Sequence, residues 1–246
     1  ATIPHVKASA PREEVGGKWE RCTSETAPRF SATAFYFARL VNEVLGVPVG
    51  IIHCSWGGSK VEGWMPRELV AGYADIDLRD TTSATCTEFL RPTVMYNGML
   101  HPLHRYTIRG FLWYQGCSNV GTDATYAERQ AAMAAHWRGL WGCDTLPFYF
   151  VEIAPYDYGG ADAGARLREA QHRAAKLIPH SGLVSTSDLV KPYERNRIHP
   201  SRKREVGERL AFMALNRTYG YSGIACDSPE FREMSLRDDG SAVLSF

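Results

Sequence analysis

Two patterns of apolar residues alternate along this chain. One is a short, nearly continuous run rich in β-branched and aromatic residues, typical of a buried strand; it predicts strands at 47–54, 107–113, 147–154 and 182–187. The other repeats every three to four residues, as on one face of a helix; it predicts helices at 31–45, 125–141, 163–178 and 200–219. Strands that alternate with helices indicate a mostly parallel sheet with helices on both faces. We therefore expect an α/β protein with three layers, α/β/α.

The first predicted helix has no predicted strand before it. Ser31 can cap its start, and Gly46 followed by Pro48 ends it. A helix that connects parallel strands normally follows a strand. We therefore expect the first strand of the sheet to lie upstream of these residues, on a segment or separate chain that completes the sheet.

The 246 residues suit one α/β domain, which we assign to residues 1–220. Within it, residues 66–100 show weak periodicity and are expected to run over the surface with short helices. Residues 221–246 have the pattern of a further β element or a C-terminal extension.

Composition excludes several classes of function. The chain has 28 basic and 27 acidic residues, so its net charge of +1 gives no case for nucleic acid or a membrane surface as partner. No apolar run approaches the roughly 18 residues that span a bilayer. Six cysteines without a C-x-x-C pair argue against a zinc site and leave disulfides open.

The predicted strand at 47–54 runs into a loop with two adjacent glycines, Ser55-Trp-Gly-Gly-Ser59. Gly57 and Gly58 let backbone N–H groups approach a ligand closely, so they are candidates for an oxyanion hole. A tight turn that needs glycine is the other interpretation. Ser55 does not fit the G-x-S-x-G nucleophile pattern, because His53 and Cys54 precede it.

Polar residues also follow two later strands. Gly116 and Asn119 follow the strand at 107–113, and the Asn119 amide can donate to an oxyanion or simply cap the turn. Asp188 and His199 follow the strand at 182–187. His199 is a candidate general base or a surface histidine. Ligands of open α/β sheets bind beyond the carboxyl ends of the strands, where these loops converge.

Several motifs together resemble the sialate O-acetylesterase family of SGNH hydrolases, in the same order over roughly residues 20–220. They are Ser55-Trp-Gly-Gly-Ser-Lys-Val-Glu-Gly-Trp64, Tyr96-Asn-Gly-Met99 with His101-Pro-Leu103, Trp113-Tyr-Gln-Gly-Cys-Ser-Asn119, Pro147-Phe-Tyr-Phe150, Arg168-Glu-Ala-Gln171 and Ile198-His-Pro200. The resemblance implies a flavodoxin-like sheet and hydrolysis of acetyl esters on sugars by an attacking serine. It implies no metal and no organic cofactor.

Carried onto this chain, the resemblance makes His199 the base and Asn119, with Gly57 or Gly58, the oxyanion donors. The residues expected to contact the acetylated sugar are Ser55, Trp56, Gln115 and Gly116. From the substrate class we expect an extracytoplasmic location, whether secreted, periplasmic or lysosomal.

The chain departs from the family pattern at three places. It lacks the Gly-Gln-Ser-Asn segment that carries the family's nucleophile, so we expect the serine upstream. Cys117 stands where relatives commonly have glutamate. Asn196 and Arg197 replace the acid that often precedes the histidine, which leaves Asp188 or Glu194 to orient His199, or a Ser–His dyad.

Other functions remain open. An acetylxylan or other polysaccharide deacetylase would use the same machinery, and a sugar-binding relative without catalysis, or an inactive fragment, would lack the serine.

Overall fold

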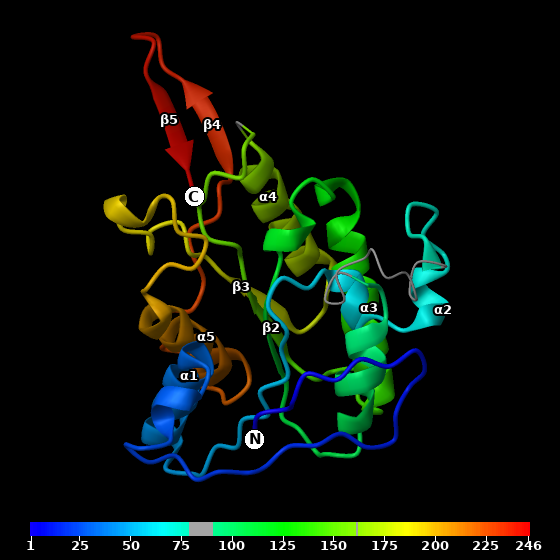
Figure 1. Ribbon diagram of the computed structural model, residues 1–246. Coiled ribbons are helices and arrows are strands. Elements are labelled where there is room, and N and C mark those ends of the chain that lie inside the picture. Colours follow the sequence, from blue (N-terminus) through cyan, green and yellow to red (C-terminus); the bar gives the residue numbers. More distant parts are fainter. Residues whose placement is uncertain (79–90, 161) are drawn as a thin grey trace.

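A three-stranded parallel sheet forms the centre of the protein, in a computed structural model that describes residues 1–78, 91–160 and 162–246 (Figure 1). The strands are β1 (Phe111–Tyr114), β2 (Phe148–Val151) and β3 (Ser181–Val184), in the order β1-β2-β3. Their registers place Phe111 beside Phe148, and Phe148 beside Ser181. The predictions of strands at 107–113, 147–154 and 182–187 are therefore confirmed, with shorter bounds.

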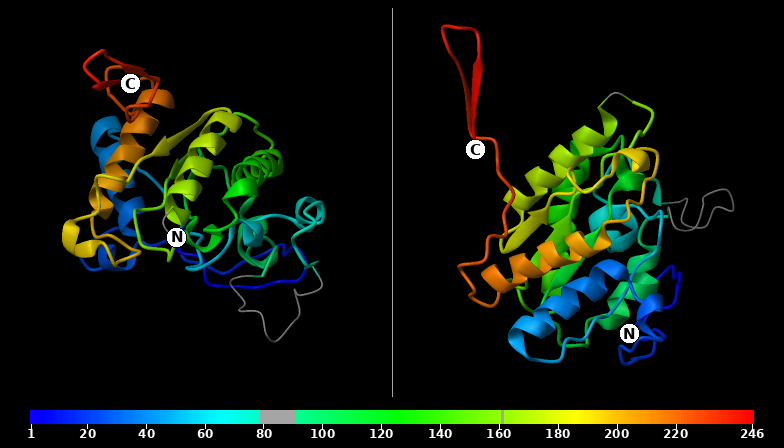
Figure 2. Two further views of the ribbon diagram at one scale, coloured as in Figure 1. Left: turned by 90° about the horizontal axis from the view of Figure 1, so that it is seen from above. Right: turned by 90° about the vertical axis from the view of Figure 1, so that its left-hand side faces the viewer.

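Two pairs of helices cover the two faces of the sheet (Figure 2). Helices α3 (Asp123–Leu140) and α4 (Ala163–Leu177) pack together on one face, and α1 (Ala32–Leu45) and α5 (Lys203–Arg217) on the other. The three layers of the predicted α/β/α fold are thus present. A helix that begins at Pro200, as predicted, would have His199 at its N-cap. Helix α5 begins three residues later, so His199 lies in the loop before the helix.

The close contact of α1 with α5 depends on a glycine. A Cβ on Gly207 would lie 2.5 Å from the carbonyl oxygen of Thr33 and 2.8 Å from Cβ of Tyr36. Real Cβ atoms do not approach other heavy atoms so closely, so only glycine allows the two helices to pack at this distance. Ser31 caps α1 through a hydrogen bond from the Ala34 N–H, and Gly46 ends it with a φ of 67°.

The prediction of a strand at 47–54 is wrong. This segment is extended, but its ladder contact within the described residues is a single parallel bridge between Thr2 and His53. The His53 N–H donates to the Ala1 carbonyl at 2.8 Å, and the Ile3 N–H donates to the His53 carbonyl at 2.9 Å. A strand needs a neighbour along its length, and within the described residues this segment has a bridge partner only at His53.

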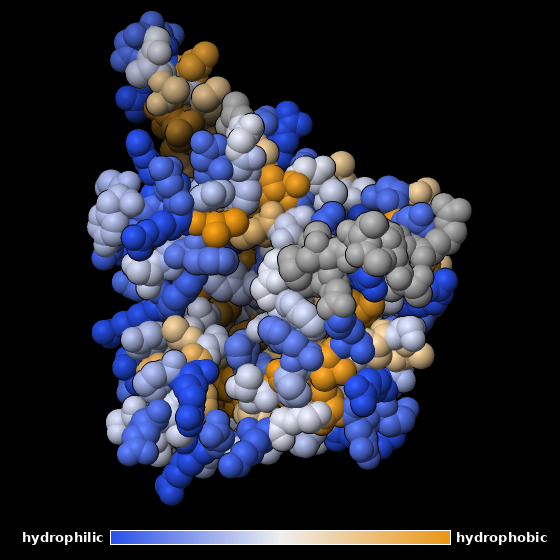
Figure 3. Space-filling view, in the orientation of Figure 1, coloured by the Kyte–Doolittle hydropathy of each residue, from blue (hydrophilic) through white to orange (hydrophobic). Residues whose placement is uncertain are grey.

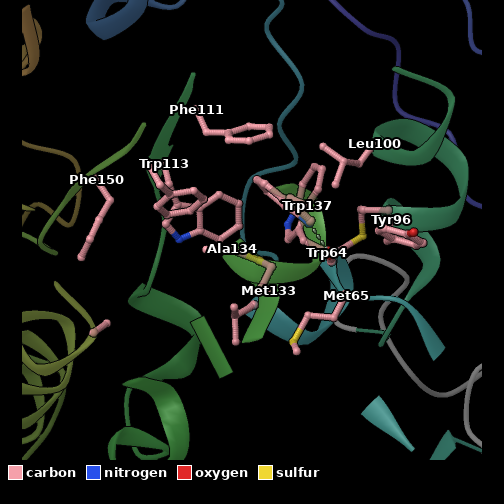
Figure 4. Close-up of a cluster of buried hydrophobic side chains, with 14 of the residues drawn as sticks. Trp64, Met65, Tyr96, Leu100, Phe111, Trp113, Met133, Ala134, Trp137 and Phe150 are labelled. Atoms are coloured by element: carbon pink, nitrogen blue, oxygen red, sulfur yellow. Dashed lines mark hydrogen bonds between the residues drawn. The ribbon is translucent and has the colours of Figure 1, made fainter. Parts of the chain in front are cut away.

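Aromatic side chains fill the core between the sheet and α3 (Figure 4). Trp113 of β1 meets Trp137 of α3 edge to face, with ring centroids 5.4 Å apart. The Trp137 indole N–H donates to the Trp64 carbonyl at 3.0 Å, which ties the loop after residue 60 to α3. Residues 94–100, at the end of the segment predicted to run over the surface, are buried in this core. Residues 79–90 of that segment lie outside the described residues.

Short helices connect these elements. They are η1 (Ala27–Arg29), η2 (Val61–Trp64), α2 (Arg67–Val70), η5 (Tyr96–Leu100), η6 (His101–Leu103), η7 (Cys117–Asn119) and η8 (Pro192–Glu194).

Beyond α5, β4 (Glu233–Leu236) and β5 (Ala242–Ser245) form an antiparallel hairpin that projects from the body (Figures 1 and 2). Its apolar side chains Met234, Leu236 and Leu244 are more than half exposed, and hydrophobic residues are visible there in Figure 3. The division into residues 1–220 and 221–246 remains a prediction.

Candidate functional site

The loop that contains the two adjacent glycines packs directly against the loop after β1. The Ser118 hydroxyl donates to the Gly58 carbonyl at 2.7 Å, and the Gln115 amide donates to the Ser59 carbonyl at 2.9 Å. The Val61 N–H donates to Oδ1 of Asn119 at 2.9 Å. Residues that are about sixty positions apart in sequence therefore form one rim at the carboxyl end of β1.

Asn119 is fully buried, and its amide group is bonded on both sides. Its Oδ1 also accepts from the Gln115 amide at 2.8 Å, while its Nδ2 donates to Glu62 at 3.1 Å and to the Thr122 hydroxyl at 3.3 Å. The contact with Thr122 is longer than the usual range for such a bond. One amide hydrogen is thus held firmly by a carboxylate, and the other is held weakly.

An ion network lies beneath this amide, with Arg129 and Glu62 buried and Asp75 exposed at its outer end. Arg129 of α3 is 2% exposed and donates to Glu62 at 2.6 Å and to Asp75 at 2.5 Å. Its guanidinium also lies over the Tyr73 ring, 4.7 Å from the centroid. Sequence reasoning missed this network. The signal available was Glu62 within Val-Glu-Gly-Trp, a charged residue in an otherwise apolar segment.

Gly116 and Gln171 hold the turn after β1 in place. Gly116 has a φ of 148°, and a Cβ there would lie 2.7 Å from Ile153 and 3.0 Å from the Gln171 amide nitrogen. That nitrogen donates to the Gln115 carbonyl at 3.0 Å, and Oε1 of Gln171 accepts from the Ile153 N–H at 2.8 Å. Gln171 therefore joins the ends of β1 and β2, which gives the Arg-Glu-Ala-Gln motif a structural role.

Ser55, Trp56 and the two glycines lie on the outer side of the rim. Ser55, Gly57 and Gly58 are exposed, and Gly58 has a φ of 78°. The Ser55 hydroxyl is 2.8 Å from Nε2 of His53, and the Trp56 ring stacks on His5 with centroids 4.3 Å apart. Burial lowers the pKa of His53, which favours the neutral imidazole at pH 7.

His199 is exposed, and the loop that carries it is held by a buried carboxylate. Glu194 is 1% exposed and accepts from the Lys191 N–H at 3.2 Å and from the Ser201 N–H at 2.9 Å. The bond from Ser201 lowers the pKa of Glu194. Glu194 therefore closes the loop from 191 to 201 around His199 without touching the imidazole.

Asp188 is committed to another partner. Within the described residues its carboxylate binds the Arg209 guanidinium in a bidentate pair, at 2.8 and 2.5 Å, and makes no hydrogen bond to His199. The bond from Arg209 lowers the pKa of Asp188. As the structure stands, Asp188 anchors the loop after β3 to α5.

A lysine joins the histidine loop to the end of β1. Lys203, four residues after His199, places its ammonium group 3.3 Å from the Tyr114 hydroxyl and 4.8 Å from the centre of that ring. Tyr114 is the last residue of β1, five residues before Asn119. Burial lowers the pKa of Lys203 and raises that of Tyr114 to about 12. The two predicted halves of the site thus lie at one edge of the sheet, although no direct contact joins His199 to Asn119 in the described residues.

Glu152, at the end of β2, was also missed from the sequence. It is 2% exposed and accepts from the Ser185 hydroxyl and the Thr186 N–H at 2.7 Å each, from the Ser187 hydroxyl at 3.0 Å, and from His172 at 3.1 Å. Burial alone would raise the pKa of Glu152, but these hydrogen bonds outweigh it and lower the pKa. The carboxylate fixes the start of the loop that leads to His199.

Cys117, the departure from the family pattern, is half-buried, and burial raises the pKa of its thiol. It is therefore a neutral group at pH 7, unlike a glutamate. The five described cysteines are free thiols, and Cys86 lies outside the described residues.

Two cavities lie at opposite edges of the sheet. One, of about 820 Å³, is lined by residues that precede the strands, among them Thr107, Pro147 and His180. The other, of about 450 Å³, is lined by residues that follow β2 and β3. The second is at the same edge as the candidate catalytic residues, and ligands of such sheets bind at that edge.

Two absences hold for the part of the chain that the structure describes. It contains no cluster of three or more histidine, cysteine, aspartate or glutamate side chains arranged to hold a metal ion. None of its helices is both long and apolar enough to cross a bilayer.

Residues 20–216 match the protein family described as carbohydrate esterase, sialic acid-specific acetylesterase. The sialate O-acetylesterase of Rattus norvegicus is 26% identical over 255 residues, which cover 84% of this chain and 46% of the rat protein. The Homo sapiens sialate O-acetylesterase is 25% identical over 235 residues, which cover 86% and 45%. A crystal structure of a carbohydrate acetylesterase from Xanthomonas citri matches with a TM-score of 0.85 at 33% identity, over 99% of this chain and 53% of that one.

These matches confirm the family resemblance and the predicted fold. The chain spans about half the length of the relatives it matches.

Proposed function

We propose that this chain, which belongs to the carbohydrate esterase family of sialic acid-specific acetylesterases, removes acetyl groups from the hydroxyls of sialic acid or a related sugar. The observation that carries the proposal is the joining of three loops at one edge of the sheet. Hydrogen bonds tie the glycine loop to the loop after β1, and Lys203 with Tyr114 ties that edge to the loop of His199.

The proposed nucleophile is a serine on a strand outside these 246 residues. Among the described strands, β1 pairs with β2 on one side, and its other edge is open. A strand added in parallel at that edge would end at the rim formed by Gly58, Ser118 and Asn119. Open edges of this kind are usually paired or covered in a finished protein.

In the proposed reaction, His199 takes the proton from the serine hydroxyl while the serine oxygen attacks the acetyl carbonyl carbon. The negative oxygen that forms is stabilised by N–H donors: the backbone at Gly57 or Gly58, and the Asn119 amide. Asn119 would supply the hydrogen that it now gives weakly to Thr122 and keep its bond to Glu62. His199 then returns the proton to the departing sugar oxygen, and water releases acetate from the serine.

His199 is oriented either by an acidic residue or, in a Ser–His dyad, without one. Asp188, the predicted orienting acid, would have to leave Arg209 to reach the imidazole. Glu194 acts through the backbone of the loop. A Ser–His dyad requires neither change.

One observation favours a second nucleophile. The hydroxyl of Ser55 already lies 2.8 Å from Nε2 of a neutral His53, beside the exposed glycines. This pair has the spacing of a serine and its general base. A chain that uses it would hydrolyse esters without an added strand.

Fluorophosphonates react with activated serines. Labelling the full-length protein with one, followed by peptide mapping, distinguishes these hypotheses. Label on a serine upstream of Ala1 supports the proposal, and label on Ser55 moves the nucleophile to the His53 pair. Absence of label, in a protein that still binds sugar, would identify a sugar-binding relative without catalysis.

Activity on acetylated sialic acid compared with acetylated xylan then separates a sialate esterase from a polysaccharide deacetylase. The sugar substrate also favours an extracytoplasmic location, which localisation of the tagged full-length protein tests.

A further inference from the structure

The cavity at the catalytic edge of the sheet has a volume of about 450 Å³. It is formed by two loops, one after β2 and one after β3. Its lining residues are Pro155, Tyr156, Asp157, Val190, Arg195 and Asn196. A volume of this size suits one sugar ring with its substituents.

One of the two loops that form this cavity also carries His199. Arg195 and Asn196 come three and four residues before His199, and the Arg197 N–H donates to the Glu194 carbonyl at 2.7 Å. Glu194 also holds Ser201 through its carboxylate. The loop is therefore closed on itself by Glu194, and the cavity residues Arg195 and Asn196 belong to the same short loop as the candidate base.

The cavity presents a cation with no anionic partner. Arg195 is exposed, and within the described ranges its guanidinium forms no ion pair with an aspartate or glutamate. Asp157 lines the cavity too, but its carboxylate accepts from the Gly159 N–H at 2.9 Å in a local turn. It remains an acceptor for a sugar hydroxyl. Tyr156 supplies an aromatic surface that meets Tyr158 edge to face at 4.9 Å.

The surrounding segment adds positive charge. Residues 191–204 contain six basic residues and one acid, Glu194; the basic residues are Lys191, Arg195, Arg197, Arg202, Lys203 and Arg204. Of these, Arg204 is paired with Glu208 at 2.8 Å. Hydrophilic side chains cover this side of the molecule (Figures 1 and 3). A positively charged cleft attracts an anionic ligand and raises its local concentration.

We propose that Arg195 selects acidic sugars by binding the substrate carboxylate in this cavity, with Tyr156 against the sugar ring and Asp157 accepting from a hydroxyl. This inference rests on the proposed esterase function and assigns it a specificity residue. A guanidinium binds a carboxylate through two parallel hydrogen bonds, which places the sugar in one orientation before the base.

The test compares Arg195→Gln with Arg197→Gln in the full-length protein. Arg197 is the matched control because it carries the same charge in the same loop but does not line the cavity. Each variant is assayed with O-acetylated N-acetylneuraminic acid, with an acetylated neutral xylo-oligosaccharide, and with p-nitrophenyl acetate, which has no sugar.

For Arg195→Gln, we expect KM for the acidic sugar to rise about tenfold to a hundredfold, the range for loss of a hydrogen bond to a charged group. We expect kcat to change little, and activity on the other two substrates to stay at the wild-type level. Arg197→Gln should resemble the wild type at 0.15 M salt, where screening weakens distant charges.

Equal losses on acidic and neutral sugars, or equal effects of the two substitutions, would overturn the role of Arg195. Calorimetric titration with N-acetylneuraminic acid as the probe does not require catalysis. Weaker binding in Arg195→Gln supports the subsite even if the wild type lacks esterase activity, whereas undiminished binding refutes it. If the wild type did not hydrolyse p-nitrophenyl acetate, the esterase proposal would be refuted but the carboxylate subsite would not.

Discussion

Replacement of Asn119 by alanine tests the central contact between the two rim loops. The side chain is fully buried, and its loss leaves the Val61 N–H without its acceptor and Glu62 without one of its donors. An orphaned buried N–H costs about 1–3 kcal/mol, and a lost bond to a charged group about 1.5–3 kcal/mol. The expected decrease in the free energy of unfolding is therefore about 2.5–6 kcal/mol, a large fraction of the roughly 5–15 kcal/mol of a typical domain.

Urea denaturation followed by tryptophan fluorescence measures this decrease, because Trp113 and Trp137 are buried beside the network. Ser118→Ala is the matched control. It removes one hydrogen bond, to the Gly58 carbonyl, from the adjacent position, and should cost about 0.5–1.5 kcal/mol. If Asn119→Ala lowered the free energy of unfolding no more than Ser118→Ala, the buried network would not be what joins these loops.

The same variant tests the proposed catalytic role once folding is taken into account. In the full-length protein, at a temperature where the variant stays folded, loss of one oxyanion donor should lower kcat by about a hundredfold or more with little change in KM. Wild-type kcat in the folded variant would assign Asn119 a structural role only.

Other predictions concern stability. Glu152 has a lowered pKa in the folded state, so its contribution to stability is fully present above the ordinary value of 4.5 and is lost as the pH falls through the folded-state pKa. Glu152→Gln should therefore lower the thermal midpoint at pH 7 and make that midpoint less dependent on pH below 4.5. A variant whose thermal midpoint fell with pH as in the wild type would contradict this. Gly116→Ala should destabilise by about 1–3 kcal/mol or more, because its φ of 148° disfavours a side chain and its Cβ would lie 2.7 Å from Ile153; an unchanged urea midpoint would show that the turn can relax. Gly207→Ala should separate α1 from α5 at a cost of about 1–3 kcal/mol, because its Cβ would lie 2.5 Å from the Thr33 carbonyl oxygen. The control is Gly139→Ala at an exposed position, where a Cβ meets nothing within 4 Å; it should be tolerated or stabilising in the same thermal assay.

Local patterns correctly predicted all four long helices and three of the four expected strands. Burial on both faces forces an apolar run such as Phe148–Val151, and the Gly46 and Ser31 caps act within a few residues of their own helix. The segment 47–54 has the same apolar character and yet is not a strand. Pairing depends on a neighbour supplied by another part of the chain, and a local pattern contains no information on whether that neighbour is present.

The sequence by itself determined the alternation of strands and helices, the family and the residue types at the strand ends, because each depends on local periodicity or on motif spacing. Tertiary structure decided which of those residues bond to each other. It paired Asp188 with Arg209, surrounded Asn119 with Glu62 and Thr122, and made Arg195 of the histidine loop line a cavity. These outcomes depend on the distances between loops that are far apart in sequence, and such distances are set by how the helices and strands pack in three dimensions.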